Sequence, residues 1–194
     1  SLERKMARAG GDAFKVIAGQ WLGSKTDWSE SHRSSVIARM ERWVFPSIGG
    51  ISVKDLTPQL ILELCLRPIE KRGIRETSKR ALGYIRAVLA YAVASGRVDR
   101  NAASELGGIL APPVSKHHQA ITEPAELSVA LKKIEGYQAS LVVQTALKLT
   151  PLLFLRPGEL RHLEWADYHP EERLFSIPGD RMKGGASHIV PLAT

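Results

Sequence analysis

The chain has 194 residues, 44% hydrophobic and 24% charged, a composition typical of a folded globular protein rather than a disordered or fibrous one. Its single cysteine, Cys65, excludes an intrachain disulfide and a cysteine-based zinc site, and fits a reducing, intracellular setting. The net charge of +7 is uneven: residues 1–110 carry 18 Lys and Arg against 11 Asp and Glu, whereas residues 111–194 carry 9 of each. This split predicts that the first segment binds a polyanion, with a basic surface that has no partner as the alternative.

Helical periodicity runs through residues 1–110. The charged opening Ser1-Leu2-Glu3-Arg4-Lys5 is unlike the start of a signal peptide. Thr57-Pro58 is typical of a helix N-cap and first turn, and Gly96 is typical of a helix end. We expect Cys65 to be buried as a small hydrophobic residue. The expected helices cover residues 3–22, Ser29 or Ser31 to Phe45, 57 to about 67, about 76 to 94, and 102–106. They predict a bundle of four or five helices.

Residues 111–121 form the predicted linker, because Pro112-Pro113 blocks a helix and the surrounding residues are polar and basic. The second segment, 122–194, opens with Thr122 as the expected N-cap of a helix. Its apolar stretch over residues 141–155 is too short to span a bilayer, so we expect a buried helix and no membrane partner. The expected elements are helices over 124–135, 139–153 and 159–163, a turn over 167–172, and strands over 173–177 and 187–192. The chain is therefore predicted to be mainly α, with a partial α+β second domain that contains a small β-hairpin.

Arg156 directly precedes Pro157-Gly158-Glu159-Leu160, a pattern typical of a helix start. The planar guanidinium of an arginine can donate to two phosphate oxygens at once, and backbone N–H groups at a helix start also favour an anion. Glu159 is placed to hold the guanidinium by a hydrogen bond. Arg156 is therefore a candidate phosphate-binding residue, and an ion pair without function is the alternative.

Lys183 follows the expected strand 173–177 and precedes Gly184-Gly185, so it lies near the tip of the predicted hairpin. A hairpin tip can reach into a DNA groove, and a lysine can transfer a proton if its pKa is lowered. The alternative is an ordinary lysine in a solvent-exposed turn.

Eight short motifs, in order, resemble the tyrosine recombinases (phage integrases), most closely the integrases of prophages and genomic islands. They are Trp43-Val44-Phe45-Pro46-Ser47-Ile48-Gly49, Leu66-Arg67-Pro68-Ile69-Glu70, Tyr91-Ala92-Val93-Ala94-Ser95-Gly96-Arg97, His117-His118-Gln119-Ala120-Ile121-Thr122, Leu155-Arg156-Pro157-Gly158-Glu159-Leu160, Ile177-Pro178, Arg181-Met182-Lys183 and His188-Ile189-Val190-Pro191-Leu192. The resemblance covers nearly the whole chain.

The resemblance implies that residues 1–110 are a SAM-like core-binding domain, which clamps duplex DNA, and that residues 122–194 begin the catalytic domain. Arg156 corresponds to the first catalytic arginine, which grips the scissile phosphate, and Lys183 to the general acid for the departing 5′-oxygen. The implied activity is site-specific recombination that integrates a mobile element, without a cofactor, through a 3′-phosphotyrosyl intermediate. The implied setting is the bacterial cytoplasm, with a full-length tetramer on attachment-site DNA and possible host architectural and excision factors.

The sequence departs from the family pattern after Lys183. The family also needs a His-x-x-Arg pair, a second His or Trp and a nucleophilic tyrosine there, whereas residues 184–194 contain no His-x-x-Arg pair and no tyrosine. Tyr84 and Tyr91 are interpreted as packing residues. We therefore expect a fragment, trimmed at both ends, that binds duplex DNA and does not cleave it. A non-catalytic DNA-binding module or regulator is the alternative, and a helical protein-interaction domain is a third, weaker hypothesis.

Basic side chains at helical spacing are the candidate DNA contacts, and a solvated helix face is the alternative interpretation. They are Arg33, Arg39 and Arg42 in the second expected helix, Arg75, Lys79 and Arg86 in or beside the fourth, and Lys116 and His117 in the linker. We expect no metal at His117-His118, since adjacent histidines point apart and no carboxylate flanks them.

Overall fold

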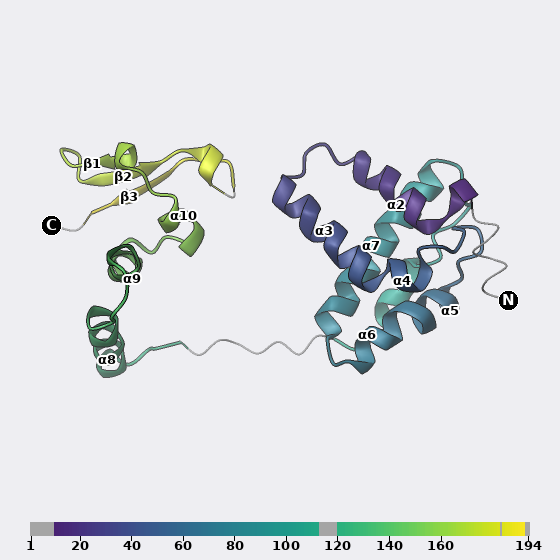
Figure 1. Cartoon of the computed structure of the whole chain (residues 1–194), viewed down its shortest axis with the longest axis horizontal. Coiled ribbons are helices and arrows are strands. Elements are labelled where there is room, and N and C mark those ends of the chain that lie inside the picture. Colours follow the sequence, from purple (N-terminus) through teal and green to yellow (C-terminus); the bar gives the residue numbers. More distant parts are fainter. Residues whose placement is uncertain (1–9, 113–119, 183, 193–194) are drawn as a thin grey trace. The chain divides into compact units, whose positions relative to one another are not determined.

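The computed structural model describes residues 10–112, 120–182 and 184–192, which fall into two compact units divided between Lys116 and His117 (Figure 1). Most of the predicted linker, with Lys116 and His117, lies outside the described residues. No helix in the described ranges is both long enough and apolar enough to cross a membrane.

The first unit is a helical bundle (Figure 1). Its elements are the 3-10 turn η1 (Gly10–Asp12), α2 (Phe14–Gly23), α3 (Glu30–Trp43), α4 (Phe45–Ile48), α5 (Pro58–Ile61), the π-helical turn η2 (Leu62–Leu66), α6 (Arg67–Lys71), α7 (Arg75–Ala94) and the 3-10 turn η3 (Ser104–Gly108). The long α7 is its centre, because it packs against α2, α3 and α6. Its buried residues recur every three or four positions: Ser78, Ala81, Leu82, Ile85, Val88, Leu89 and Ala92.

Helix ends in the first unit follow the capping residues in the sequence. The side chain of Ser29 accepts a hydrogen bond from His32 N–H at 3.3 Å, so α3 begins at Glu30, and the hydroxyl of Thr57 does the same for α5. Gly96 ends α7 with a left-handed φ of 69°, as expected. Cys65 is buried, and burial raises the pKa of its thiol to about 12, which leaves it an unreactive core residue.

Three expected helices in the first unit differ from the structure. The helix expected over 3–22 is interrupted, because Gly10 adopts a φ of 42° that an α-helix does not allow, and α2 begins at Phe14; residues 3–9 of that prediction lie outside the described residues. The third does not end near Arg67 but continues through Lys71, and the π-helical turn η2 accommodates Pro68, which has no N–H to donate. The segment expected as a helix over 102–106 is the 3-10 turn η3, positioned by Asn101, whose side chain accepts from Ala103 N–H at 3.0 Å.

The second unit combines helices with a small sheet. Its elements are α8 (Pro124–Glu135), α9 (Leu141–Leu153), α10 (Pro157–Arg161), the 3-10 turn η4 (Trp165–Asp167), β1 (Tyr168–His169), β2 (Leu174–Ile177), the 3-10 turn η5 (Gly179–Arg181) and β3 (His188–Pro191). The three strands are antiparallel in the order β1-β2-β3, with Phe175 opposite both Tyr168 and Val190. The predicted fold class, mainly α with a small sheet, is confirmed.

Local boundaries in the second unit also differ from expectation. Thr122 is not the N-cap of α8, which is Glu123 without a side-chain cap. The helix expected over 159–163 begins two residues earlier, because Pro157 occupies its first turn and Arg156 is its N-cap. The expected turn over 167–172 contains the short strand β1, which pairs with β2.

The second unit has a small core. Among its described residues, the buried hydrophobic side chains are Leu153, Leu155, Ile177 and Val190. Large apolar side chains remain exposed, among them Leu141, Val142, Phe154 and Trp165, and the expected buried helix α9 buries only Leu153.

Candidate functional site

Arg156 lies between the end of α9 and the start of α10. The chain leaves α9 through Phe154, in a left-handed conformation with φ 51°, and Leu155 then packs into the core of the second unit. Arg156 is the N-cap of α10 with extended backbone angles, and 69% of its side chain is exposed. The fold therefore anchors the backbone of Arg156 and leaves its guanidinium accessible.

Glu159 orients Arg156. One carboxylate oxygen of Glu159 accepts from Arg156 Nη1 at 2.6 Å, and the other accepts from Arg156 backbone N–H at 3.0 Å. The side chain of Glu159 is only 9% exposed. The side-chain hydrogen bond from Arg156, followed by the backbone one, lowers the pKa of Glu159, so the carboxylate stays charged at neutral pH. The hydrogen bond expected between these residues is present, and it fixes the direction of the guanidinium fork.

Arg156 and Glu159 line an open depression of about 460 Å³. The other lining residues are Gly158, His162, Asp180, Arg181 and Met182. His162 Nδ1 lies 2.7 Å from the carbonyl oxygen of Gly158, which fixes the ring against α10. The depression therefore brings α10 and the segment after β2 together, with a cation from each.

Arg181 is the second cation of this depression, and it is tied to the fold. It donates to both carboxylate oxygens of the buried Asp167, one of them at 2.9 Å, and to the carbonyl oxygen of His162 at 2.9 Å. The bonds from Arg181 lower the pKa of Asp167 and those from Asp167 raise that of Arg181. This pair connects η4 to η5, and so holds the segment that leads to Lys183. Lys183 itself lies outside the described residues, so its role stays a prediction.

The candidate DNA-binding arginines of the first unit divide into two groups. Arg33 donates to the carbonyl oxygens of Leu22, at 2.7 Å, and Lys25. Arg86 donates to those of Ala103, at 2.9 Å, and Ser104, at 2.6 Å. These two guanidinium groups therefore satisfy carbonyl oxygens at and just beyond the end of α2 and at the start of η3, which is a structural role. Their contact with DNA stays an untested prediction.

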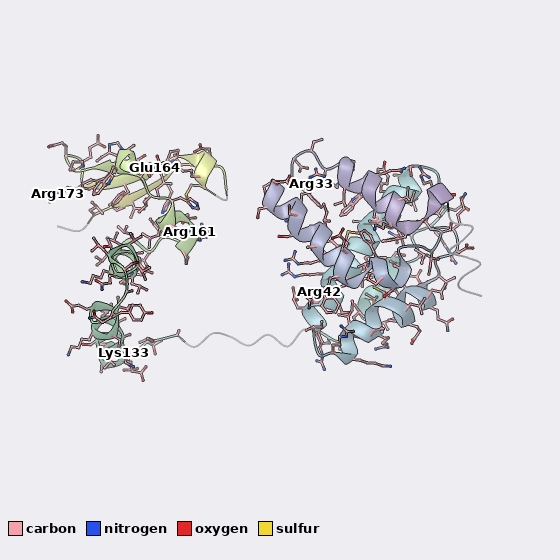
Figure 2. All side chains as sticks on the ribbon, viewed as in Figure 1. Arg33, Arg42, Lys133, Arg161, Glu164 and Arg173 are labelled. Atoms are coloured by element: carbon pink, nitrogen blue, oxygen red, sulfur yellow. The ribbon has the colours of Figure 1, made fainter. Side chains whose placement is uncertain are left out.

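The remaining candidates are less engaged. Arg39 donates to the hydroxyl of Tyr84 at 3.2 Å, and Arg75 donates to the carbonyl oxygen of Pro112 at 3.4 Å. Arg42 and Lys79 are exposed, and neither side chain forms a hydrogen bond or ion pair with another residue that the structure describes. Figure 2 shows Arg33 at the beginning and Arg42 at the end of α3.

Comparison with known proteins gives the family. Residues 14–109 match the family model of the phage integrase central domain. The chain is 29% identical to the integrase of Enterobacteria phage P4, in an alignment that covers 98% of this chain and 46% of that protein. It is 28% identical to the prophage integrase IntS of Escherichia coli K12, in an alignment that covers 99% of this chain and 50% of that protein. The chain belongs to the tyrosine recombinase (phage integrase) family. It spans about half the length of the curated integrases it matches.

Solved tyrosine recombinases share its fold. A lambda integrase tetramer bound to a Holliday junction matches with a TM-score of 0.74 and 13% identity, covering 97% of this chain and 54% of that one. The Tn1549 transposon integrase in complex with circular intermediate DNA matches with a TM-score of 0.71 and 14% identity. This match covers 93% of this chain and 61% of that one. At these identities the likeness establishes the fold of this recombinase chain.

Sequence reasoning missed two features of this recombinase chain. The bridge between Asp167 and Arg181 was not predicted, although an acidic residue before the first strand pair and an arginine after it are compatible with such a bridge. Arg72 was also overlooked. It lies 5.5 Å from the ring of Trp43, and only the packing of α6 beside the end of α3 brings these residues together.

Proposed function

We propose that this chain is part of a site-specific DNA recombinase that integrates a mobile element by cleaving and rejoining DNA through a 3′-phosphotyrosyl intermediate. The observation that carries the proposal is the exposed guanidinium of Arg156, oriented by Glu159 beside an open depression, in a member of the tyrosine recombinase family. Residues 1–110 are proposed as the core-binding domain, and 122–194 as the N-terminal part of the catalytic domain.

The first unit is proposed to clamp duplex DNA. Its surplus positive charge and the exposed cations Arg42 and Lys79 suit contacts with backbone phosphates, which give affinity and register but carry no sequence information. The DNA complexes named for lambda and Tn1549 integrases support this partner. Lys116 and His117 are proposed to follow the same backbone.

In the second unit, Arg156 is proposed to bind the non-bridging oxygens of the scissile phosphate. Its planar fork matches two such oxygens, and its charge offsets the negative charge that develops as the phosphoryl group is transferred. Glu159 holds the fork in place, so little reorganisation is needed when DNA binds. Lys183 is proposed to donate a proton to the departing 5′-oxygen.

The tyrosine nucleophile is proposed to lie outside these 194 residues. Tyr84 accepts a hydrogen bond from Arg39, and Tyr91 packs against the core of the first unit. Tyr137 follows α8, and the ring of Tyr168 stacks on Phe175 at 5.2 Å. None of the four is among the described residues that line the Arg156 depression. The chain alone should therefore bind duplex DNA without forming a covalent adduct, and an adduct with a nicked attachment-site duplex would refute this.

The full-length protein is proposed to act as a tetramer on DNA, because lambda integrase binds a Holliday junction as a tetramer. Host architectural and excision factors are proposed as further partners.

The decisive test replaces Arg156 in a full-length protein that carries this chain. Arg156→Ala should reduce cleavage at least about 100-fold, since losing one preorganised donor to a developing oxyanion costs roughly 100- to 1,000-fold. Duplex affinity should stay within about twofold, because a single phosphate contact among several is lost. Arg161→Ala, at the end of the same helix and not among the described residues that line the depression, is the matched control and should leave cleavage unchanged. An equal loss of binding and cleavage in Arg156→Ala would reduce Arg156 to a structural role.

A further inference from the structure

Trp43, at the end of α3, has an arginine from each of two elements on its ring. The guanidinium carbon of Arg42 lies 5.1 Å from a ring centroid of Trp43, and that of Arg72 lies 5.5 Å from it. Both distances are within the range of about 6 Å for a cation–π interaction. Arg42 directly precedes Trp43 in the last turn of α3, whereas Arg72 follows α6, so only the tertiary fold brings the second cation to the same indole.

The ring of Trp43 is a fixed support. Trp43 is half-buried and packs against the core of the first unit, and its carbonyl oxygen accepts a hydrogen bond from the buried thiol of Cys65 at 3.4 Å. Because the indole cannot turn without disturbing that core, it holds both guanidinium groups within a narrow range of positions.

The two guanidinium groups are exposed and not neutralised. Within the described part of the chain, no carboxylate lies within ion-pair distance of Arg42 or Arg72, whereas Arg67, Arg80 and Arg97 each have one. A cation–π contact with an indole does not occupy all five N–H donors of a guanidinium, so donors remain available for an anion. Two like charges gathered on one ring repel each other, and an anion with oxygen acceptors relieves that repulsion.

We propose that Arg42, Trp43 and Arg72 form a phosphate-binding platform that contacts the backbone of duplex DNA. The platform rests on the proposed function and deepens it: it adds Arg72 as a DNA contact and Trp43 as the residue that positions both arginines. A preorganised arginine loses less side-chain entropy on binding than a freely moving one, so Trp43 contributes to affinity without touching DNA. The platform provides register and affinity and reads no base.

The test measures the affinity of the chain for a fluorescent attachment-site duplex between about 50 and 200 mM salt. Arg72→Gln should lower the slope of log K against log salt by about 0.9, the value for one lost phosphate contact. Arg80→Gln is the matched control: it removes the same charge from an exposed arginine, one already paired with Glu76 at 2.9 Å, and should leave the slope unchanged.

The substitution Trp43→Leu tests whether the ring of Trp43 positions the two arginines, because it leaves their charges in place. It keeps the net charge, and it should lower affinity several-fold because the arginines lose their common support, whereas Trp43→Phe keeps an aromatic face and should retain most of the affinity. Thermal unfolding of each variant checks the fold. If Trp43→Leu does not fold, the difference in salt slope between Arg72→Gln and Arg80→Gln decides whether the platform contacts DNA.

Equal slopes for Arg72→Gln and Arg80→Gln would overturn the platform, since they would mean that only total charge matters. So would a loss of thermal stability in Arg72→Gln with unchanged DNA binding, which would make the arginine a stabiliser of the α6 C-terminus. An unmodified chain without salt-dependent duplex binding would instead refute the proposed function itself, and the platform with it.

Discussion

The basic side chains of the first unit differ in what their charged groups contact. Arg33 gives two hydrogen bonds to carbonyl oxygens at and beyond the end of α2, whereas Lys79 is exposed on α7 and bonds to no described residue. A guanidinium that replaces water at buried carbonyl oxygens stabilises the fold, whereas an exposed ammonium interacts mainly with distant charge. These two residues should therefore affect different properties of the protein.

Arg33→Gln should lower the free energy of unfolding of the first unit by roughly 1–3 kcal/mol, the usual effect of losing hydrogen bonds from a charged donor. The salt slope of duplex binding should stay unchanged. Lys79→Gln should have the opposite effects. The free energy of unfolding should change by less than about 0.5 kcal/mol, and the salt slope of duplex binding should fall by about 0.9. Urea unfolding and DNA titrations on the same preparations measure both properties. A reduced salt slope in Arg33→Gln at full stability would place Arg33 on the DNA after all.

Among the helices, α7 shows how local backbone geometry and packing act together. One face of this helix is the centre of the first core, and Gly96, just beyond its end, reverses the chain with a φ of 69°. Gly83 lies on the exposed face in the middle of α7, with ordinary helical geometry. A Cβ atom at either position would meet no atom within 4 Å, so only backbone conformation distinguishes the two sites.

Alanine at these glycines should change stability in opposite directions. Gly96→Ala should cost about 1–2 kcal/mol, because an L-residue is strained in the left-handed region. Gly83→Ala should gain roughly 0.5–1 kcal/mol, because alanine loses less entropy in a helix than glycine. Thermal or urea unfolding of both variants measures the difference. If both substitutions stabilised the protein, the turn after α7 would not need a left-handed residue.

For the whole chain, burial differs sharply between the two units. The first has one continuous core that includes side chains from α2, α3 and α7, whereas the described part of the second buries four hydrophobic side chains. α8 buries none of its side chains, and Phe154 and Trp165 are about nine-tenths exposed. Since burial of apolar surface is the main favourable term in folding, the two units should differ in stability.

Native-state hydrogen exchange should show this difference. Amides in the middle of α7 should be the most protected, since they open only with the whole first unit, and amides of α8 should exchange fastest among the long helices. The same experiment on a full-length protein that contains this chain provides the comparison. Protection of α8 equal to that of α7 in the 194-residue chain would contradict the expected ranking.

The sequence by itself determined the helical periodicity, a serine cap at Ser29 or Ser31, the cap at Thr57, the end of α7 at Gly96 and the position of Arg156 beside Glu159. These features depend on residues within a few positions of each other, so local propensity and hydrogen bonding decide them. The integrase motifs, read in order, also gave the family. The continuation of a helix across Pro68 was not predictable in this way, because it depends on the π-helical turn before it.

Only the tertiary structure decided which basic residues are bound to the fold and which are left for a partner. On a helical stripe, Arg33, Arg42 and Arg86 look equivalent. Packing then places carbonyl oxygens beside Arg33 and Arg86, and it brings Arg72 to the ring of Trp43, which the neighbouring Arg42 also contacts. The physical reason is that the role of a guanidinium depends on the groups beside it, and for Arg33, Arg86 and Arg72 these groups come from other structural elements, which only the folded chain brings close.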